Sequence, residues 1–158
     1  MNEVETGTRW VLALDPGKVT GWAMYNTEDH PLQDLLYGEV EGRYGLADHV
    51  RRIIGSGAII EVVCEDFVIS ERTIKTARDN NALRLIGWLD IQLDHLGVEL
   101  SLQTAGQAKG FSTDEKLSAV GWLDTTPGGH SNDAKRHLLV YLLRRYPDHA
   151  AELLKEYR

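Results

Sequence analysis

Three acidic residues stand at positions where the sequence predicts a strand to end or a helix to begin. Asp15 and Glu65 each close an apolar run, and Asp133 falls in the first turn of a late predicted helix. In open α/β sheets functional groups gather beyond the strand ends, so these carboxylates are expected to converge there. Carboxylates held together repel one another unless a cation neutralises them, and such oxygen ligands favour Mg²⁺ or Mn²⁺. Two such ions about 3.5–4 Å apart are the standard arrangement for in-line attack on a phosphodiester.

Each acid also has an ordinary structural explanation. Asp15 precedes a Pro-Gly pair, which is typical of a turn. Glu65 and Asp66 fit the solvated end of a strand, and Asp133 near a helix N-terminus interacts favourably with the helix dipole. The prediction of a site therefore depends on all three acids standing at element ends together.

The spacing of apolar residues predicts the elements that would position these acids. Val11 to Leu14 is an uninterrupted apolar run that stops at Asp15, as expected of a strand buried on both faces. Two more strands follow closely enough to form an antiparallel meander, and two later strands alternate with helices. The predicted strands are 10–15, 20–26, 35–40, 58–64 and 98–102. The predicted helices lie within 45–56, 80–96, 112–122, 131–145 and 147–157.

This order of elements predicts one α/β domain over residues 1–158, with a short tail helix at about 147–157. A meander that leads into strand–helix–strand crossovers makes a five-stranded mixed sheet flanked by helices. Two helix starts carry capping signals. Ser112 to Glu115 match a capping box, and Ser131 or Asn132 is expected to cap the helix that holds Asp133.

The composition excludes several classes of protein. With 42% hydrophobic and 26% charged residues the chain is neither disordered nor a disulfide scaffold. The lone Cys64 lies among apolar residues, which predicts packing and a reducing, cytoplasmic setting, and the apolar runs are too short to span a bilayer. The net charge of −7 is uneven: residues 1–71 carry a balance of −8, whereas residues 72–145 carry +2. A nucleic-acid partner is therefore compatible with the charge, provided that it lies along the basic part.

Several motifs in their order along residues 11–143 carry a resemblance to a known family. They are Leu12-Ala13-Leu14-Asp15-Pro16-Gly17 with Thr20-Gly21-Trp22-Ala23, then Val63-Cys64-Glu65, the segments 104–109 and 112–116, and His130-Ser131-Asn132-Asp133-Ala134. The sequence resembles the RuvC-type Holliday junction resolvases, which have the ribonuclease H-like fold. The resemblance implies a metal site at Asp15, Glu65, His130 and Asp133, with His130 as a metal ligand or a group that assists proton transfer. Glu65 is preferred over its neighbour because adjacent strand residues face opposite sides of a sheet.

The resemblance also implies contacts with DNA. Lys109 and Lys116 match family positions whose lysines contact phosphates near the metals, with Lys116 close enough to count in the catalytic set; a solvated helix face is the alternative for both. Six residues are predicted to contact DNA: Lys109, Lys116, Arg72, Lys75, Arg78 and Phe67. Among them, Arg72, Lys75 and Arg78 recur at a spacing of three residues. They would therefore form a phosphate track on one face of a helix, or else belong to a flexible polar loop. Phe67 matches a stacking aromatic only with an offset, and core packing is equally compatible with its position.

The resemblance thus implies a divalent-metal-dependent, structure-selective endonuclease that hydrolyses branched DNA at two Mg²⁺ or Mn²⁺ ions. A homodimer is expected, because a two-fold dimer presents two equivalent sites to a two-fold junction. Two alternatives stay open at this point. The same fold could serve a YqgF-like RNA nuclease or a flap or fork nuclease, since fold does not determine substrate, or the chain could be a catalytically silent branched-DNA binding module.

Overall fold

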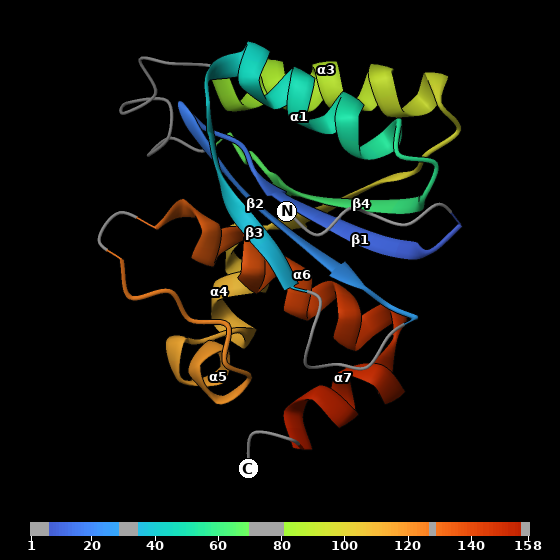
Figure 1. Ribbon diagram of the computed structural model, residues 1–158. Coiled ribbons are helices and arrows are strands. Elements are labelled where there is room, and N and C mark those ends of the chain that lie inside the picture. The colour runs from blue at the N-terminus through green and yellow to red at the C-terminus, as the bar shows by residue number, and fades with distance from the viewer. Residues whose placement is uncertain (1–6, 29–34, 70–80, 127–128, 156–158) are drawn as a thin grey trace.

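A single five-stranded sheet lies between two layers of helices (Figure 1). The computed structural model describes residues 7–28, 35–69, 81–126 and 129–155. Helices α1 and α3 cover one face of the sheet, and α4, α5, α6 and α7 lie on the other side (Figure 1). No helix within these described ranges is long and apolar enough to cross a membrane.

The sheet has the strand order β3-β2-β1-β4-β5. The strands are β1 Arg9–Asp15, β2 Val19–Asn26, β3 Leu35–Glu41, β4 Ile59–Asp66 and β5 Leu100–Thr104. The pairs β1–β2 and β2–β3 are antiparallel, whereas β1–β4 and β4–β5 are parallel. This arrangement confirms the predicted meander followed by crossovers, with the last two strands extending two residues beyond their expected ends.

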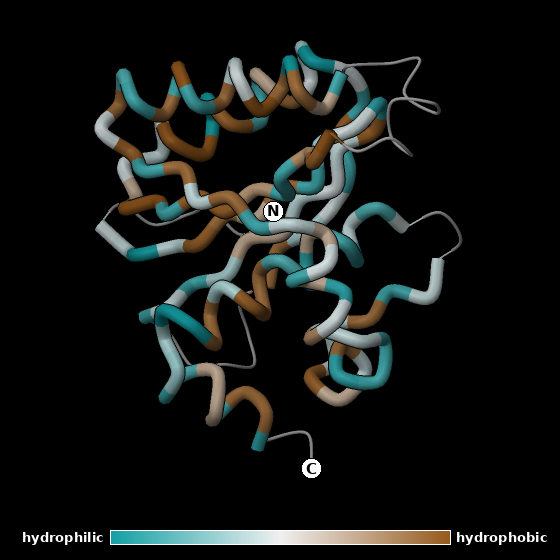
Figure 2. Tube along the Cα trace, turned by 180° about the vertical axis from the view of Figure 1, so that it is seen from behind, coloured by the Kyte–Doolittle hydropathy of each residue, from teal (hydrophilic) through white to brown (hydrophobic). Residues whose placement is uncertain are grey.

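The centre of strand β1 is apolar because both of its faces are covered. Val11 and Ala13 belong to the core cluster under α6 and α7, while Leu12 and Leu14 belong to the cluster under α1 and α3. All four side chains are fully buried. Figure 2 shows hydrophobic and hydrophilic segments alternating along α1 and α3, as expected of helices with one face against the sheet. The acid at the end of β1 is therefore anchored by packing on both sides.

The helices largely follow their predicted positions, with two corrections at their starts. Their bounds are α1 Gly42–Ile54, α3 Asn81–His95, α4 Ala105–Phe111, α5 Asp114–Ala119, α6 His130–Arg145 and α7 Pro147–Lys155. The N-cap of α5 is Thr113, one residue later than the predicted capping box. Helix α6 begins at His130 with Gly129 as N-cap and no side-chain cap, so the predicted capping by Ser131 or Asn132 was wrong.

A tertiary contact explains why Asn132 does not cap α6. Its side-chain amide donates to the carbonyl of Asp124 at 2.7 Å and accepts from the backbone N–H of Asp124 at 2.9 Å. Ser131 is buried instead. Asn132 therefore holds the preceding loop against the helix instead of capping it.

Helix α4 was absent from the predicted elements. Only Ala108 of its seven residues is buried, so the segment offers no apolar period to detect. Its start nevertheless has a full capping box, in which Thr104 accepts from the backbone of Gln107 and Gln107 accepts from the backbone of Thr104. The Thr-x-x-Gln spacing is the signal that would have found it.

A candidate active site at the carboxyl edge of the sheet

Asp15 and Glu65 lie at the same edge of the sheet because β1 and β4 run parallel. Leu14 pairs with Cys64, so the next residue on each strand is one of the two acids. Cys64 itself is fully buried, and burial raises the pKa of its thiol well above the ordinary value. The carboxyl ends of the parallel strands thus present two carboxylates side by side.

The third acid reaches this edge through a close approach of α6 to β2. Gly21 pairs with Asp15 in the β1–β2 ladder, and a Cβ built on Gly21 would lie 2.1 Å from the carbonyl oxygen of His130. Only glycine permits backbone contact of this kind. The missing side chain lets the first turn of α6, which carries Asp133, pack directly beside the end of β1.

The Asp15 carboxyl is affected by its burial and by the charges of the other two acids. Burial, followed by the negative charges of Glu65 and Asp133, raises the pKa of Asp15 to about 7, and the ammonium of Lys109 acts in the opposite direction. A buried carboxyl beside charges of like sign is harder to ionise than a carboxyl in water. Asp15, Glu65 and Asp133 therefore form one electrostatic group.

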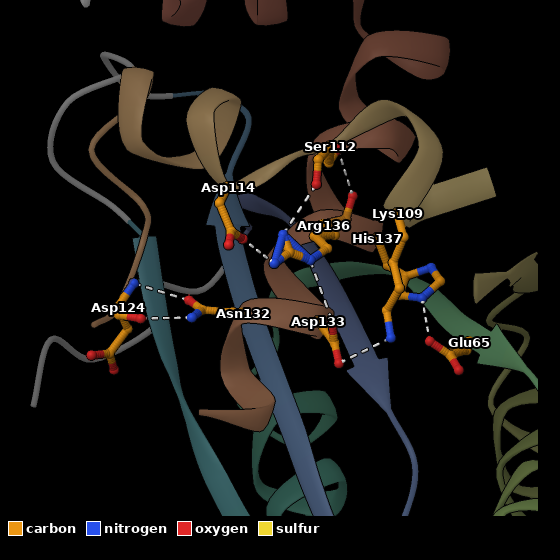
Figure 3. Close-up of polar contacts among 9 residues, drawn as sticks. All are labelled: Glu65, Lys109, Ser112, Asp114, Asp124, Asn132, Asp133, Arg136 and His137. Atoms are coloured by element: carbon orange, nitrogen blue, oxygen red, sulfur yellow. Dashed lines mark hydrogen bonds and ion pairs between the residues drawn. The ribbon is translucent and has the colours of Figure 1, made fainter. Parts of the chain in front are cut away.

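Two of the acids have positively charged or hydrogen-bonding partners from the chain itself (Figure 3). Asp133 forms ion pairs with the Lys109 ammonium at 3.4 Å and with the Arg136 guanidinium at 3.3 Å. Glu65 Oε2 lies 2.8 Å from Nε2 of His137. In this arrangement Lys109 and Arg136 supply positive charge beside the acids.

Arg136 connects α6 to the turn between α4 and α5. Besides Asp133, its guanidinium contacts the Asp114 carboxylate and donates to the Ser112 carbonyl at 3.1 Å. The Ser112 hydroxyl donates in return to the carbonyl of Arg136 at 3.2 Å. These contacts (Figure 3) fix the helices that carry Lys109 and Lys116 relative to the acids.

The remaining predicted site residues occupy different surroundings. His130 is exposed at the first position of α6, one turn before Asp133, and its backbone N–H donates to Glu39 Oε1 at 2.6 Å. Lys116 donates to the Phe111 carbonyl at 2.7 Å and lies 3.8 Å from the centre of the Phe111 ring.

Four predicted DNA contacts belong to the chain that follows β4. Phe67 comes directly after Asp66, the last residue of that strand, and is half-buried. Arg72, Lys75 and Arg78 lie outside the described residues. Their predicted role as a phosphate track therefore stays a prediction.

His137 was missed when the sequence was interpreted. It lies four residues after Asp133 on α6, a spacing that places both side chains on one face of a helix. That spacing was the available signal, but nothing in the sequence shows that Glu65 lies beneath this face. The structure thus brings His137, a histidine other than the predicted His130, into direct contact with Glu65.

The chemistry of the acid group fits a divalent cation. Three carboxylates supply hard oxygen donors, and the Lys109 ammonium between α4 and α6 shows that a positive charge is accommodated beside Asp133. Within the described residues, no three His, Cys, Asp or Glu side chains are already gathered tightly enough to hold a metal ion. Binding of an ion would therefore require at least Asp133, which is ion-paired with Lys109 and Arg136, to turn toward it.

Comparisons with known proteins identify the fold. No family model matches the chain, and no curated protein matches its sequence. Among solved structures the chain is similar to T. thermophilus RuvC in complex with a Holliday junction substrate, with a TM-score of 0.60 and 17% sequence identity. The similarity covers 87% of this chain and 96% of the other. The chain therefore has the ribonuclease H-like fold of the RuvC type, as the sequence resemblance implied.

Proposed function

We propose that the chain is a divalent-metal-dependent endonuclease that hydrolyses phosphodiester bonds in branched DNA, in the manner of a Holliday junction resolvase. The observation that carries this proposal is the acid group of Asp15, Glu65 and Asp133 at the carboxyl edge of a RuvC-type sheet. The neighbouring structure is that of a RuvC bound to a Holliday junction substrate, which supports branched DNA as the substrate class. A catalytically silent binding module is less favoured, because uncompensated carboxylates repel phosphate unless a cation intervenes.

In this proposal Asp15, Glu65 and Asp133 hold two Mg²⁺ or Mn²⁺ ions, with His130 as a fourth ligand or proton carrier. When bound, the ions would activate the attacking water and stabilise the leaving oxygen. His130 is exposed one turn from Asp133, so its imidazole is accessible to solvent and substrate. Burial and the two neighbouring acids raise the pKa of Asp15, so a bound cation would favour its charged form.

The lysines would hold the DNA backbone next to the acids. Lys109 is ion-paired with Asp133, so turning Asp133 toward a cation would release the ammonium for a phosphate. Lys116 is bound to a neutral carbonyl instead of a carboxylate, which leaves its charge uncompensated by that contact. The predicted contacts through Arg72, Lys75 and Arg78 would extend this surface, with Phe67 at its start. A homodimer would present two such sites, related by its two-fold axis, to the two-fold symmetric four-way junction.

The test compares labelled four-way, forked, flap and linear DNA and an RNA hairpin in Mg²⁺, Mn²⁺ and EDTA. We expect metal-dependent cleavage of branched DNA by the native chain and loss of at least about 100-fold in Asp15→Asn and Glu65→Gln, which remove charge at nearly constant size. Glu152→Gln, an exposed acid on α7, is the matched control and should cleave normally.

Three outcomes would decide against the proposal or refine it. Undiminished cleavage by Asp15→Asn or Glu65→Gln would refute the assignment of the acids. Preferential cleavage of the RNA hairpin, or of flaps and forks, would replace four-way DNA as the substrate. Branched-DNA binding that is indifferent to Mg²⁺ and without cleavage in any metal would identify a binding module.

A further inference from the structure

His137 is a buried polar side chain that is held at both ring nitrogens. Its side chain is 1% exposed, and Nε2 lies 2.8 Å from Oε2 of Glu65. Its Nδ1 lies 3.2 Å from Oε1 of Gln103, which is itself buried at the end of β5. The imidazole of α6 is thus fixed between the carboxyl ends of β4 and β5.

The direction of the bond to Glu65 follows from the chemistry of its acceptor. A carboxylate oxygen only accepts hydrogen bonds, so the imidazole must carry a hydrogen on Nε2 and donate it to Oε2. The side-chain amide of Gln103 can present either its oxygen or its nitrogen to Nδ1, so it satisfies the ring in that state. Gln103 thereby fixes the orientation of the His137 ring, while the bond to Glu65 sets the hydrogen on Nε2.

This bond restricts a carboxylate that water would otherwise leave free to rotate. The side chain of Glu65 is 23% exposed, whereas the group that donates to it is buried. The His137 imidazole, which is fixed by packing and by its contact with Gln103, holds Oε2 of Glu65 toward α6. The bond engages one oxygen of Glu65, and the geometry of the carboxylate is set before any ligand binds.

Burial of an imidazole has a cost that a purely structural role does not explain well. An apolar side chain at this position of α6 would pack beside the fully buried Ala134, one turn earlier, without burying a polar ring. The polar ring instead lies against Glu65, an acid of the candidate site near the end of a strand. We propose that His137, held by Gln103, is a positioning residue that orients the Glu65 carboxylate toward a divalent cation.

This inference rests on the proposed function, because it takes Glu65 to be one of the acids that hold the ion. Groups that donate to a metal-binding carboxylate fix its direction, and removing such a group typically weakens metal affinity about 10–100-fold. The inference therefore concerns metal affinity first and cleavage second. It assigns His137 a role that differs from that of His130, which touches none of these partners in the described contacts.

Three variants separate positioning from packing. His137→Leu removes the donor at similar bulk, and His137→Gln retains a side-chain N–H that can reach Glu65. Leu142→Ala is the matched control, because Leu142 is fully buried on the same helix and belongs to the core near α7. Gln103→Leu removes the other partner of the ring and gives a second readout if His137→Leu does not fold.

The first measurement is Mn²⁺ binding to the DNA-free full chain by calorimetry or electron paramagnetic resonance, with the thermal midpoint recorded in parallel. We expect the Kd for Mn²⁺ to rise about 10–100-fold in His137→Leu, and by less in His137→Gln and Gln103→Leu. Leu142→Ala should lower the thermal midpoint and leave the Kd unchanged. In cleavage assays the defect of His137→Leu should diminish as Mg²⁺ is raised, because the maximal rate is less affected than the metal requirement.

Native Mn²⁺ affinity in a folded His137→Leu or Gln103→Leu variant would overturn the inference, and so would an equal loss in Leu142→Ala. In either case metal-dependent cleavage by the native chain would leave the proposed function standing. If the native chain binds no Mn²⁺ and cleaves no substrate in any metal, the proposed function fails and the positioning role fails with it.

Discussion

Replacing Gly21 with alanine tests whether the approach of α6 to β2 sets the site. The added Cβ would lie 2.1 Å from the His130 carbonyl oxygen, 2.4 Å from its carbonyl carbon and 2.9 Å from the Ser131 nitrogen. The first distance is about 1 Å shorter than 3.0 Å, the distance below which Cβ atoms in proteins essentially never contact another atom. All three atoms are backbone, so no rotamer change can relieve the contact, and the first turn of α6 must move by about 1 Å.

The magnitude follows from this displacement. Overpacking typically costs about 1–3 kcal/mol, and a contact between two backbones should lie at the upper end. For a domain of this size, about 3 kcal/mol lowers the thermal midpoint by roughly 6–12 °C. A shift of about 1 Å in the turn that carries Asp133 should lower the cleavage rate about 100-fold, beyond the loss explained by unfolded protein.

The assay measures single-turnover cleavage of a four-way junction at 20 °C or below, where the variant stays folded, together with thermal denaturation. Gly87→Ala is the control, because a Cβ on Gly87 in α3 has nothing within 4 Å and should stabilise the chain by about 0.4–1 kcal/mol without changing the rate. A Gly21→Ala chain with native thermal midpoint and native rate would refute the reasoning that this approach positions Asp133.

Three further predictions concern charge and hydrogen bonding. In EDTA, Asp15 with its folded-state pKa of about 7 stabilises the fold below about pH 4, and this contribution, at most about 4 kcal/mol, is lost as pH rises through 7. Asp15→Asn should therefore flatten the fall in thermal midpoint between pH 4 and 7, and an unchanged fall would contradict the raised pKa. Tyr141→Phe removes the 2.7 Å hydrogen bond to Glu61 and should lower the free energy of unfolding by about 1.5–3 kcal/mol in urea denaturation, with native cleavage of the folded protein. Lys109→Met should weaken binding to all DNA forms alike. It should also make the fall of the logarithm of the DNA-binding constant with the logarithm of salt concentration less steep by about 1, and an unchanged slope in titrations would show that Lys109 contacts no phosphate.

The strands were predictable because burial on two faces leaves a simple trace in the sequence. The run that ends at Asp15 is apolar at every position since each face of β1 meets a separate core cluster. Helix α4 had no comparable apolar pattern, because only one of its residues is buried. Its start is marked by a capping box instead. The start of α6 was misassigned because Asn132 binds a loop that precedes the helix, a contact between segments that no local pattern records.

Polarity in the sequence was a poor guide to exposure on α6. Lys135 is fully buried, with its ammonium 3.3 Å from the centre of the Tyr37 ring, although a lysine is usually solvated. Burial lowers the pKa of Lys135 to about 8. The same helix buries His137 against Glu65, and both residues would have been assigned to the surface from their types alone.

The sequence by itself determined that acids stand at the ends of strands and at the start of a helix, because turns and apolar runs are local features. Parallel pairing of β1 with β4, in the register that the structure shows, then makes Asp15 and Glu65 neighbours. Only the tertiary structure decided that Gly21 admits α6 to this edge, that Lys109 pairs with Asp133, and that His137 contacts Glu65. These contacts join residues from different elements, and their geometry depends on how closely the backbones approach, which spacing along one chain does not encode.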